Sequence, residues 1–154
     1  VPLVELEPDT FQKVVDVKVR GTYLCSRAVA KVLIDQGEGG KIVTVASAAG
    51  KVAGATALAY NAANFAQIGM TQSMALDLGP HRINVNAVCP GTVDTARLDP
   101  LGRDEAWQKM AEDVPVRRLG TSTEVGGLIA YLCTEASSWI HGQSINIGGG
   151  TVMD

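Results

Sequence analysis

Two short β-branched runs, each lying between long helical patterns, limit this chain to a layered α/β fold. The runs are Ile-Val-Thr-Val-Ala at 42–46 and Arg-Ile-Asn-Val-Asn-Ala-Val at 82–88. Neither has a helical period, and both are short enough to be buried strands. Strands that alternate with helices pair in parallel through right-handed crossovers. The alternation therefore predicts a parallel sheet with helices packed on its faces.

The segments around these strands have helical patterns and clear stop signals. Apolar residues recur every three to five positions from Pro8, a favourable first helical residue, to the Gly37–Gly40 stop. Thr121 and Glu124 have the spacing of a capping box, which opens a later helix. The expected elements are a long helix over 8–35, a strand at 42–46, a helix over 58–79, a strand at 82–88, a helix near 103–113, a helix over 122–135 and a strand at 144–147.

The predicted sheet has few strands for its architecture. Three parallel strands would leave one edge open and apolar. The chain also begins at Val1 and not at Met. We therefore expect a single partial domain over 1–154, whose sheet is completed by upstream sequence or covered by a partner.

Charge and composition exclude several classes of function. A net charge of −3 and a pI near 5.3 give no basic surface for nucleic acid or anionic membranes. The apolar runs are far shorter than the ~20 residues of a membrane span. Cys25, Cys89 and Cys133 form no C-x-x-C pair, and His81 and His141 are isolated, so no metal site is expected. These features predict a cytoplasmic protein without nucleic-acid, membrane or metal partners.

Polar residues follow the predicted strands at the edge where α/β proteins bind ligands. Ligands in open α/β sheets lie beyond the carboxyl ends of the strands. Ser47 directly follows the 42–46 strand, and the 90–95 segment follows the 82–88 strand. Tyr60 lies in the first turn of the next helix, with Asn64 one turn further on the same face. A phenol and a neighbouring hydroxyl can act as an acid/base pair if a cation is close.

Three motifs occur in a characteristic order along the chain. They are Thr44-Val45-Ala46-Ser47-Ala48-Ala49-Gly50, then Tyr60-Asn61-Ala62-Ala63-Asn64, then the run from Ile83 to Thr95 with Cys89-Pro90-Gly91 at its centre. With 17–21, Arg118-Leu119-Gly120 and the Gly-rich end, they closely resemble the C-terminal part of the short-chain dehydrogenase/reductase family over essentially the whole chain. The resemblance implies a Rossmann-type fold, a doubly wound parallel sheet in three α/β/α layers. It also implies an NAD or NADP cofactor and hydride transfer between an alcohol and a carbonyl.

The resemblance assigns roles to individual positions. Tyr60 matches the family's proton donor and acceptor, and Ser47 matches the hydroxyl that orients the substrate. Pro90, Gly91, Val93 and Thr95 lie in the segment that matches the loop at the nicotinamide end of the cofactor, and 94–114 matches the substrate lid. The resemblance suggests a small diol, polyol or hydroxyketone as substrate. It further implies a homodimer or homotetramer assembled through the helices over 8–35 and 58–79.

The sequence departs from the family at two matched positions. The family has Lys four residues after its Tyr, where this chain has Asn64, and Asn in a V-N-x-x-G setting, where this chain has Lys18. Asn64 carries no charge and cannot stabilise a tyrosinate. One interpretation is that the exchange disables the site and leaves a binding or assembly module; another is that Lys18 supplies the cation from the opposite helix. A third interpretation is an engineered change, or a different chemistry that uses Ser47 and Tyr60.

The family's glycine-rich dinucleotide loop would lie upstream of Val1, as would the residue that selects NAD or NADP. Gly37-Glu38-Gly39-Gly40-Lys41 is not a phosphate loop, because Ile42 stands where Ser or Thr is required and a strand follows. Gly148-Gly149-Gly150 leaves too few residues for a following helix. The sequence therefore predicts catalytic and lid residues without a complete nucleotide site.

Overall fold

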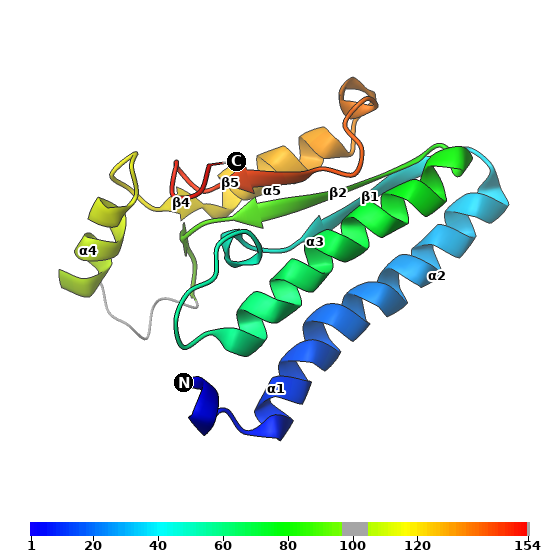
Figure 1. Ribbon diagram of the computed structural model, residues 1–154. Coiled ribbons are helices and arrows are strands. Elements are labelled where there is room, and N and C mark those ends of the chain that lie inside the picture. The colour runs from blue at the N-terminus through cyan, green and yellow to red at the C-terminus, as the bar shows by residue number, and fades with distance from the viewer. Residues whose placement is uncertain (97–104, 154) are drawn as a thin grey trace.

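A parallel sheet lies at the centre of the computed structural model, which describes residues 1–96 and 105–153. Its strands are β1 (Gly40–Val45), β2 (Ile83–Pro90) and β5 (Ser144–Ile147), in the order β1-β2-β5. A short parallel pair, β3 (Val93–Asp94) with β4 (Gly120–Thr121), lies beyond the carboxyl end of β2 (Figure 1). The strands run in parallel as expected, and their carboxyl ends meet at one edge.

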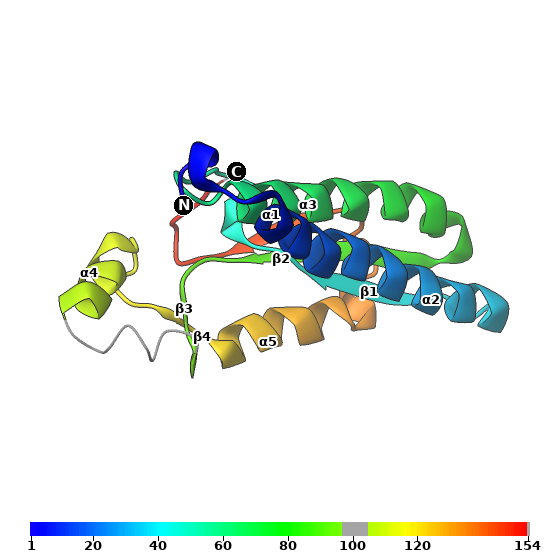
Figure 2. The same cartoon turned by 90° about the horizontal axis from the view of Figure 1, so that it is seen from below.

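Helices cover both faces of the sheet. On one face, α1 (Pro8–Val15), a π-helical turn η2 (Asp16–Arg20) and α2 (Gly21–Gln36) form one long rod beside α3 (Leu58–Leu78). On the other face lies α5 (Ser122–Leu132), as Figure 2 shows. This arrangement confirms the predicted three-layer α/β fold. The rod spans the predicted 8–35 helix with one further residue, but it contains a π turn that the pattern did not reveal.

The core lies between α3 and β2. Ala75 and Leu78 of α3 pack against Ile83 and Val85 of β2, and all four are buried. The central strand β2 has helices on both faces, so six of its eight residues are buried, the polar Asn86 among them. The carboxyl end of this buried strand leads directly into the loop at 90–95.

Short 3₁₀ turns complete the fold, and several boundaries differ from those expected; the strand expected at 42–46, for example, spans Gly40–Val45. The turns are η1 (Leu3–Glu5), η3 (Ala48–Gly50), η4 (Gly79–His81) and η6 (Glu135–Ser137). β2 begins one residue later than expected because Arg82 has a left-handed backbone, φ +59°. The helix expected over 122–135 ends at Leu132, where the Thr134 and Ser137 hydroxyls bind carbonyl groups of its last turn.

The predicted lid lies only partly within the described residues. Its helix α4 spans Glu105–Asp113 at the carboxyl-end edge of the sheet (Figure 1). Positions 97–104 of the predicted lid lie outside the described residues. Among the described residues, no helix has both the length and the apolar character that a membrane crossing requires.

Candidate active site

A cleft of about 920 Å³ opens at the carboxyl ends of β1 and β2. It contains six of the eight predicted site residues, namely Ser47, Tyr60, Pro90, Gly91, Val93 and Thr95. The remaining wall consists of Val14, Ala46, Thr56, Ala57, Thr92, Ser122, Val125, Gly126 and Ile129. The edge that the sequence indicated is thus a cleft in the folded chain, and no charged residue is among its described lining.

Ser47 is held at the mouth of β1 by its own turn. It is the N-cap of η3, and its Oγ accepts a hydrogen bond from the Ala49 backbone N–H at 3.1 Å. This bond uses the oxygen only as an acceptor, so the hydroxyl proton can be donated to a ligand in the cleft. The cap therefore fixes the position of the hydroxyl and keeps its donor function.

Tyr60 enters the same cleft from the first turn of α3. Its side chain is 36% exposed, and its backbone carbonyl accepts a hydrogen bond from Asn64 Nδ2 at 2.8 Å. The loop before the helix is tied by Asn61, whose Nδ2 donates to the Gly54 carbonyl at 2.8 Å. These bonds fix the start of α3, from which the phenol projects.

Lys18 and Asn64, the two exchanged positions, meet beside Tyr60. Lys18 Nζ donates to Asn64 Oδ1 at 2.7 Å and lies 4.9 Å from the centre of the Tyr60 ring. Asn64 is completely buried, whereas Lys18 is partly exposed. A cation therefore reaches the phenol ring from the opposite helix, at a distance typical of a cation–π contact.

The π turn helps to bring Lys18 into contact with Asn64. It contains one residue more per hydrogen-bonded ring than an α-helix, and the Gly21 N–H binds the Asp16 carbonyl five residues back. An inserted residue rotates the residues on either side of it by ~100° relative to each other. The turn thereby sets the direction in which Lys18 leaves the rod.

The 90–95 loop approaches the last strand very closely. A Cβ on Gly91 would lie 2.8 Å from the Gly148 Cα, closer than real Cβ contacts occur. The Gly91 N–H binds the Ile147 carbonyl at 3.0 Å. Only glycine fits here, and Gly91 lines the same cleft as Ser47 and Tyr60.

The far wall of the cleft comes from α5, whose start is fixed by a charged cap. Thr121 and Glu124 form the predicted capping box, and Arg118 binds both carboxylate oxygens at 2.6 and 3.0 Å. The Arg118 hydrogen bond, followed by the bonds from Thr121, lowers the pKa of Glu124 from 4.5 to about 2. Glu124 in turn raises the pKa of Arg118. The capping box was visible in the sequence, but the contribution of Val125, Gly126 and Ile129 to the cleft was not.

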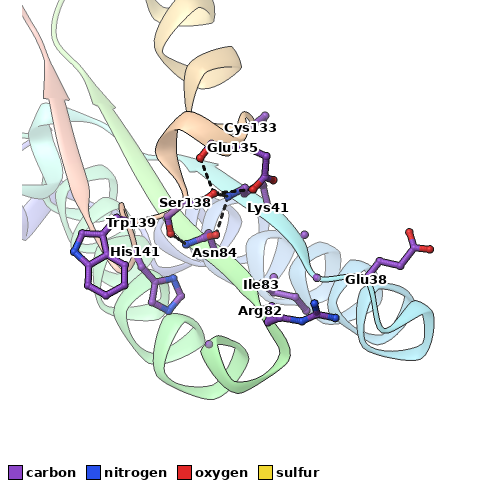
Figure 3. Close-up of a pocket in the computed structure, with 13 residues that line it drawn as sticks. Glu38, Lys41, Arg82, Ile83, Asn84, Cys133, Glu135, Ser138, Trp139 and His141 are labelled. Atoms are coloured by element: carbon purple, nitrogen blue, oxygen red, sulfur yellow. Dashed lines mark hydrogen bonds between the residues drawn. The ribbon is translucent and has the colours of Figure 1, made fainter.

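A second cleft of about 820 Å³ lies at the amino ends of the strands. Figure 3 shows that Lys41 binds two other polar groups of this cleft: Lys41 Nζ donates to Asn84 Oδ1 at 2.8 Å and to Ser138 Oγ at 3.2 Å. The Ser138 hydroxyl also donates to Glu135 Oε2. None of the predicted site residues lies here, and parallel sheets bind ligands at the other edge.

Comparisons with known proteins agree on one family. A family model described as "Enoyl-(Acyl carrier protein) reductase" matches residues 1–152. Sorbitol dehydrogenase of Cereibacter sphaeroides is 35% identical over 162 aligned positions, covering 99% of this chain and 63% of that protein.

Solved structures give the same result in three dimensions. Acetoin dehydrogenase from Enterobacter cloacae is 37% identical with a TM-score of 0.88, covering 98% of this chain and 59% of that one. A 4-hydroxyisoleucine dehydrogenase complexed with NADH is 31% identical with a TM-score of 0.93, covering 99% and 63%. Other solved relatives hold NADP. The chain spans about 60% of the length of the curated relatives that it matches.

Proposed function

The chain belongs to the short-chain dehydrogenase/reductase family, and from this premise we propose that it carries the acid/base site of an NAD(P)-dependent alcohol/carbonyl oxidoreductase. One observation carries the proposal: a lysine ammonium lies 4.9 Å from the centre of the Tyr60 ring although the position four residues after Tyr60 is Asn. The site keeps its hydroxyl, its phenol and a cation, and these are the groups that proton transfer at a carbonyl oxygen requires.

The residues present fit the nicotinamide end of such a cofactor. Gly91, packed against the Gly148 backbone, leaves its part of the cleft lining without a side chain, and Ser47 and Tyr60 line the same cleft. NAD or NADP supplies the hydride-transfer chemistry when it is bound. Ser47 donates a hydrogen bond to the substrate oxygen, and Tyr60 gives that oxygen a proton in reduction or removes it in oxidation.

Lys18 and Asn64 divide the work of one family residue. The Lys18 ammonium stabilises the negative charge that develops on the Tyr60 oxygen when the proton leaves. Asn64 holds the ammonium through Oδ1 and is itself held through Nδ2 on the Tyr60 carbonyl. The amide is therefore fixed by α3, and the cation is fixed by the amide.

The chemistry of the cleft favours a small neutral substrate. Its described lining has hydroxyl, apolar and glycine surfaces but no charged side chain that would pair with a carboxylate or phosphate. A hydroxyketone, diol or polyol fits this lining. Relatives that act on acetoin and sorbitol point to the same class.

The proposed assembly is a cytoplasmic homodimer or homotetramer that uses the long helices. Apolar side chains are exposed along them, among them Val17 at 75%, Leu24 at 49% and Phe65 at 46%. Surfaces of this kind on a monomer would be unusual, because exposed apolar patches commonly mark interfaces.

Nucleotide titration and turnover of the intact protein together test the proposal. We expect NADH or NADPH fluorescence to change on binding, and a hydroxyketone to oxidise the bound nucleotide. Tyr60→Phe keeps the ring and removes the proton donor, so it should bind nucleotide normally and lose ~10²–10⁴-fold in turnover. Binding without turnover in the parent would favour the alternative, a catalytically impaired member of the family that acts as a binding or assembly module. Absence of both binding and turnover would reject the oxidoreductase.

A further inference from the structure

A strip of buried polar side chains runs from Tyr60 into the interface between α2 and α3. On α3, Asn64, Gln67 and Thr71 follow Tyr60 on one helical face and are 0%, 4% and 0% exposed. On the facing rod, Lys18 and Thr22 are one turn apart. Buried polar groups are costly unless they are hydrogen-bonded, so a strip of this kind calls for an account of each group.

The strip contains a second connection between the two helices, separate from the Lys18–Asn64 contact. The Thr22 hydroxyl donates to the Lys18 carbonyl at 2.6 Å, and Gln67 Nε2 donates to the Thr22 oxygen at 2.8 Å. The chain Gln67–Thr22–Lys18 thus begins on α3 and ends on the backbone of the π turn. Lys18 is held at both ends, at its ammonium by Asn64 and at its carbonyl by Thr22.

The numbers of available donors and acceptors fix which group donates in the Gln67–Thr22–Lys18 hydrogen bonds. Gln67 Oε1 is buried and has no hydrogen-bond partner among the described residues. A flipped amide would bring Oε1 to Thr22, but the single Thr22 proton is already bound to the Lys18 carbonyl. Gln67 must therefore donate, and its other end is left unsatisfied. A buried acceptor without a partner lowers stability, which indicates that the donor end serves a purpose.

We propose that Gln67 and Thr22 are positioning residues for Lys18: they stabilise the π turn at the Lys18 carbonyl and so aim the ammonium at Tyr60. The inference rests on the proposed function, in which Lys18 is the cation of the site. A threonine hydroxyl bound to a carbonyl four residues back bends a helix, and a π turn is the local form such a distortion takes here. Gln67 holds the Thr22 side chain in the rotamer that makes this bond.

The position of the Lys18 ammonium can be measured without any turnover. The ε-methylene of Lys18 is bonded to an ammonium that lies 4.9 Å from the centre of the Tyr60 ring, so we expect its NMR signal to carry a ring-current shift that falls when the side chain moves away. The signal is assigned by its loss in Lys18→Arg. Thr22→Val removes the hydroxyl and keeps the shape; Gln67→Met removes the amide and keeps the length. Ser26→Ala is the matched control, because Ser26 is buried one turn beyond Thr22 on the same helix.

We expect Thr22→Val and Gln67→Met each to reduce the ring-current shift, and the double variant to reduce it no further than Thr22→Val alone, since both act through one chain. Thr22→Ser keeps the hydroxyl and should therefore retain the ring-current shift of the parent. Ser26→Ala should leave the shift unchanged. Turnover should follow the same order, with kcat lower by up to ~10²-fold, the effect of a ~1 Å misplacement, and KM almost constant.

Specific results would overturn the inference. An unchanged Lys18 signal in a folded Thr22→Val variant would do so, and Gln67→Met serves as the test if Thr22→Val does not fold. An equal loss of the ring-current shift in Ser26→Ala would show that the effect comes from general helix packing and not from the Gln67–Thr22–Lys18 hydrogen bonds. A parent without turnover would reject the proposed function, whereas the NMR comparison would still decide whether Gln67 and Thr22 position Lys18.

Discussion

Lys18 and Asn64 are 46 residues apart in the sequence, yet Lys18 Nζ lies 2.7 Å from Asn64 Oδ1 in the folded chain. The contact joins the π turn of the first rod to the first turns of α3. The Nδ2 of the same amide donates to the Tyr60 carbonyl. The amide therefore cannot rotate away from the ammonium without losing a hydrogen bond. The two positions therefore act as one unit beside the phenol.

Reversing the exchange tests this unit. Lys18→Ala should lower turnover by ~10²–10⁴-fold, because the phenol loses its cation. Asn64→Lys alone should destabilise the protein, since it buries a second ammonium beside Lys18 at a site that is 0% exposed. The double variant Lys18→Asn with Asn64→Lys should recover turnover. If the double variant were no more active than Lys18→Ala, the two residues would not share one role.

The glycine contact under the cleft gives a second prediction. Gly91→Ala places a Cβ 2.8 Å from the Gly148 Cα, and the atoms that it meets are all Gly148 backbone, which cannot give way cheaply. We expect a loss of ~1–3 kcal/mol in the free energy of unfolding by urea, the usual cost of overpacking. Gly127→Ala on α5 is the control: its Cβ would meet nothing within 4 Å, and it should stabilise the helix by up to ~1 kcal/mol.

Much of the fold could be predicted because its signals are local. The β-branched runs, the Pro8 start and the capping box at Thr121 each mark an element within a few residues. The boundary at Arg82 could not be predicted, because a left-handed backbone is usually signalled by Gly or Asn and not by Arg. The π turn was hidden for a similar reason: an apolar pattern with irregular spacing does not reveal one inserted residue.

The candidate site divides in the same way. Ser47, Tyr60 and the 90–95 loop could be brought together from the sequence, since the carboxyl ends of neighbouring parallel strands share one edge. The contact of Lys18 with Asn64 could not be fixed, because it depends on the rotation of the rod after the π turn. The cleft wall from α5 and the Gln67–Thr22 hydrogen bond depend on how whole helices pack. The spacing of residues in the sequence does not indicate this packing.

Acid should reveal the charged cap of α5. The Glu124 pKa is lowered to about 2, so the cap stabilises the folded state above the ordinary pKa of 4.5 and loses this contribution as the pH falls towards 2. Glu124→Gln should therefore have a lower melting temperature than the parent at pH 6. The difference between the two should shrink progressively below pH 4.5. A constant difference from pH 6 to pH 3 would show that the charge of Glu124 contributes nothing.

The proposed interface predicts a change in molecular mass. Phe65 is exposed on α3, so Phe65→Glu adds a charge to the proposed helix interface and should not disturb the core. Sedimentation should show the parent as a dimer or tetramer and the variant nearer to the 16.1 kDa monomer. Trp139→Glu changes a fully exposed side chain beside the second cleft and should leave the assembly intact. Dissociation by Trp139→Glu alone would move the interface to that end of the molecule.

His141 binds the part of β2 with which β5 does not pair. β5 begins opposite Ala87, so within residues 1–96 and 105–153 no strand pairs with the first half of β2 on that side. There the Val85 N–H donates to His141 Nδ1 at 3.2 Å, and Gly142 N–H binds the Val85 carbonyl. Since Nδ1 accepts, the ring proton is on Nε2, which contacts the Ala75 carbonyl of α3 at 2.8 Å. One imidazole thus joins the central strand to the helix above it.

Removing this imidazole should therefore lower the free energy of unfolding by more than its partial exposure suggests. His141→Ala leaves the N–H of the fully buried Val85 without its partner, and we expect a loss of ~1–3 kcal/mol in the free energy of unfolding by urea. His141→Gln can still accept from Val85 and donate to Ala75, so it should lose less. His81→Ala changes an exposed ring and should stay within ~0.5 kcal/mol of the parent. Equal midpoints for His141→Ala and His81→Ala would mean that water replaces the imidazole and that His141 does not tie β2 to α3.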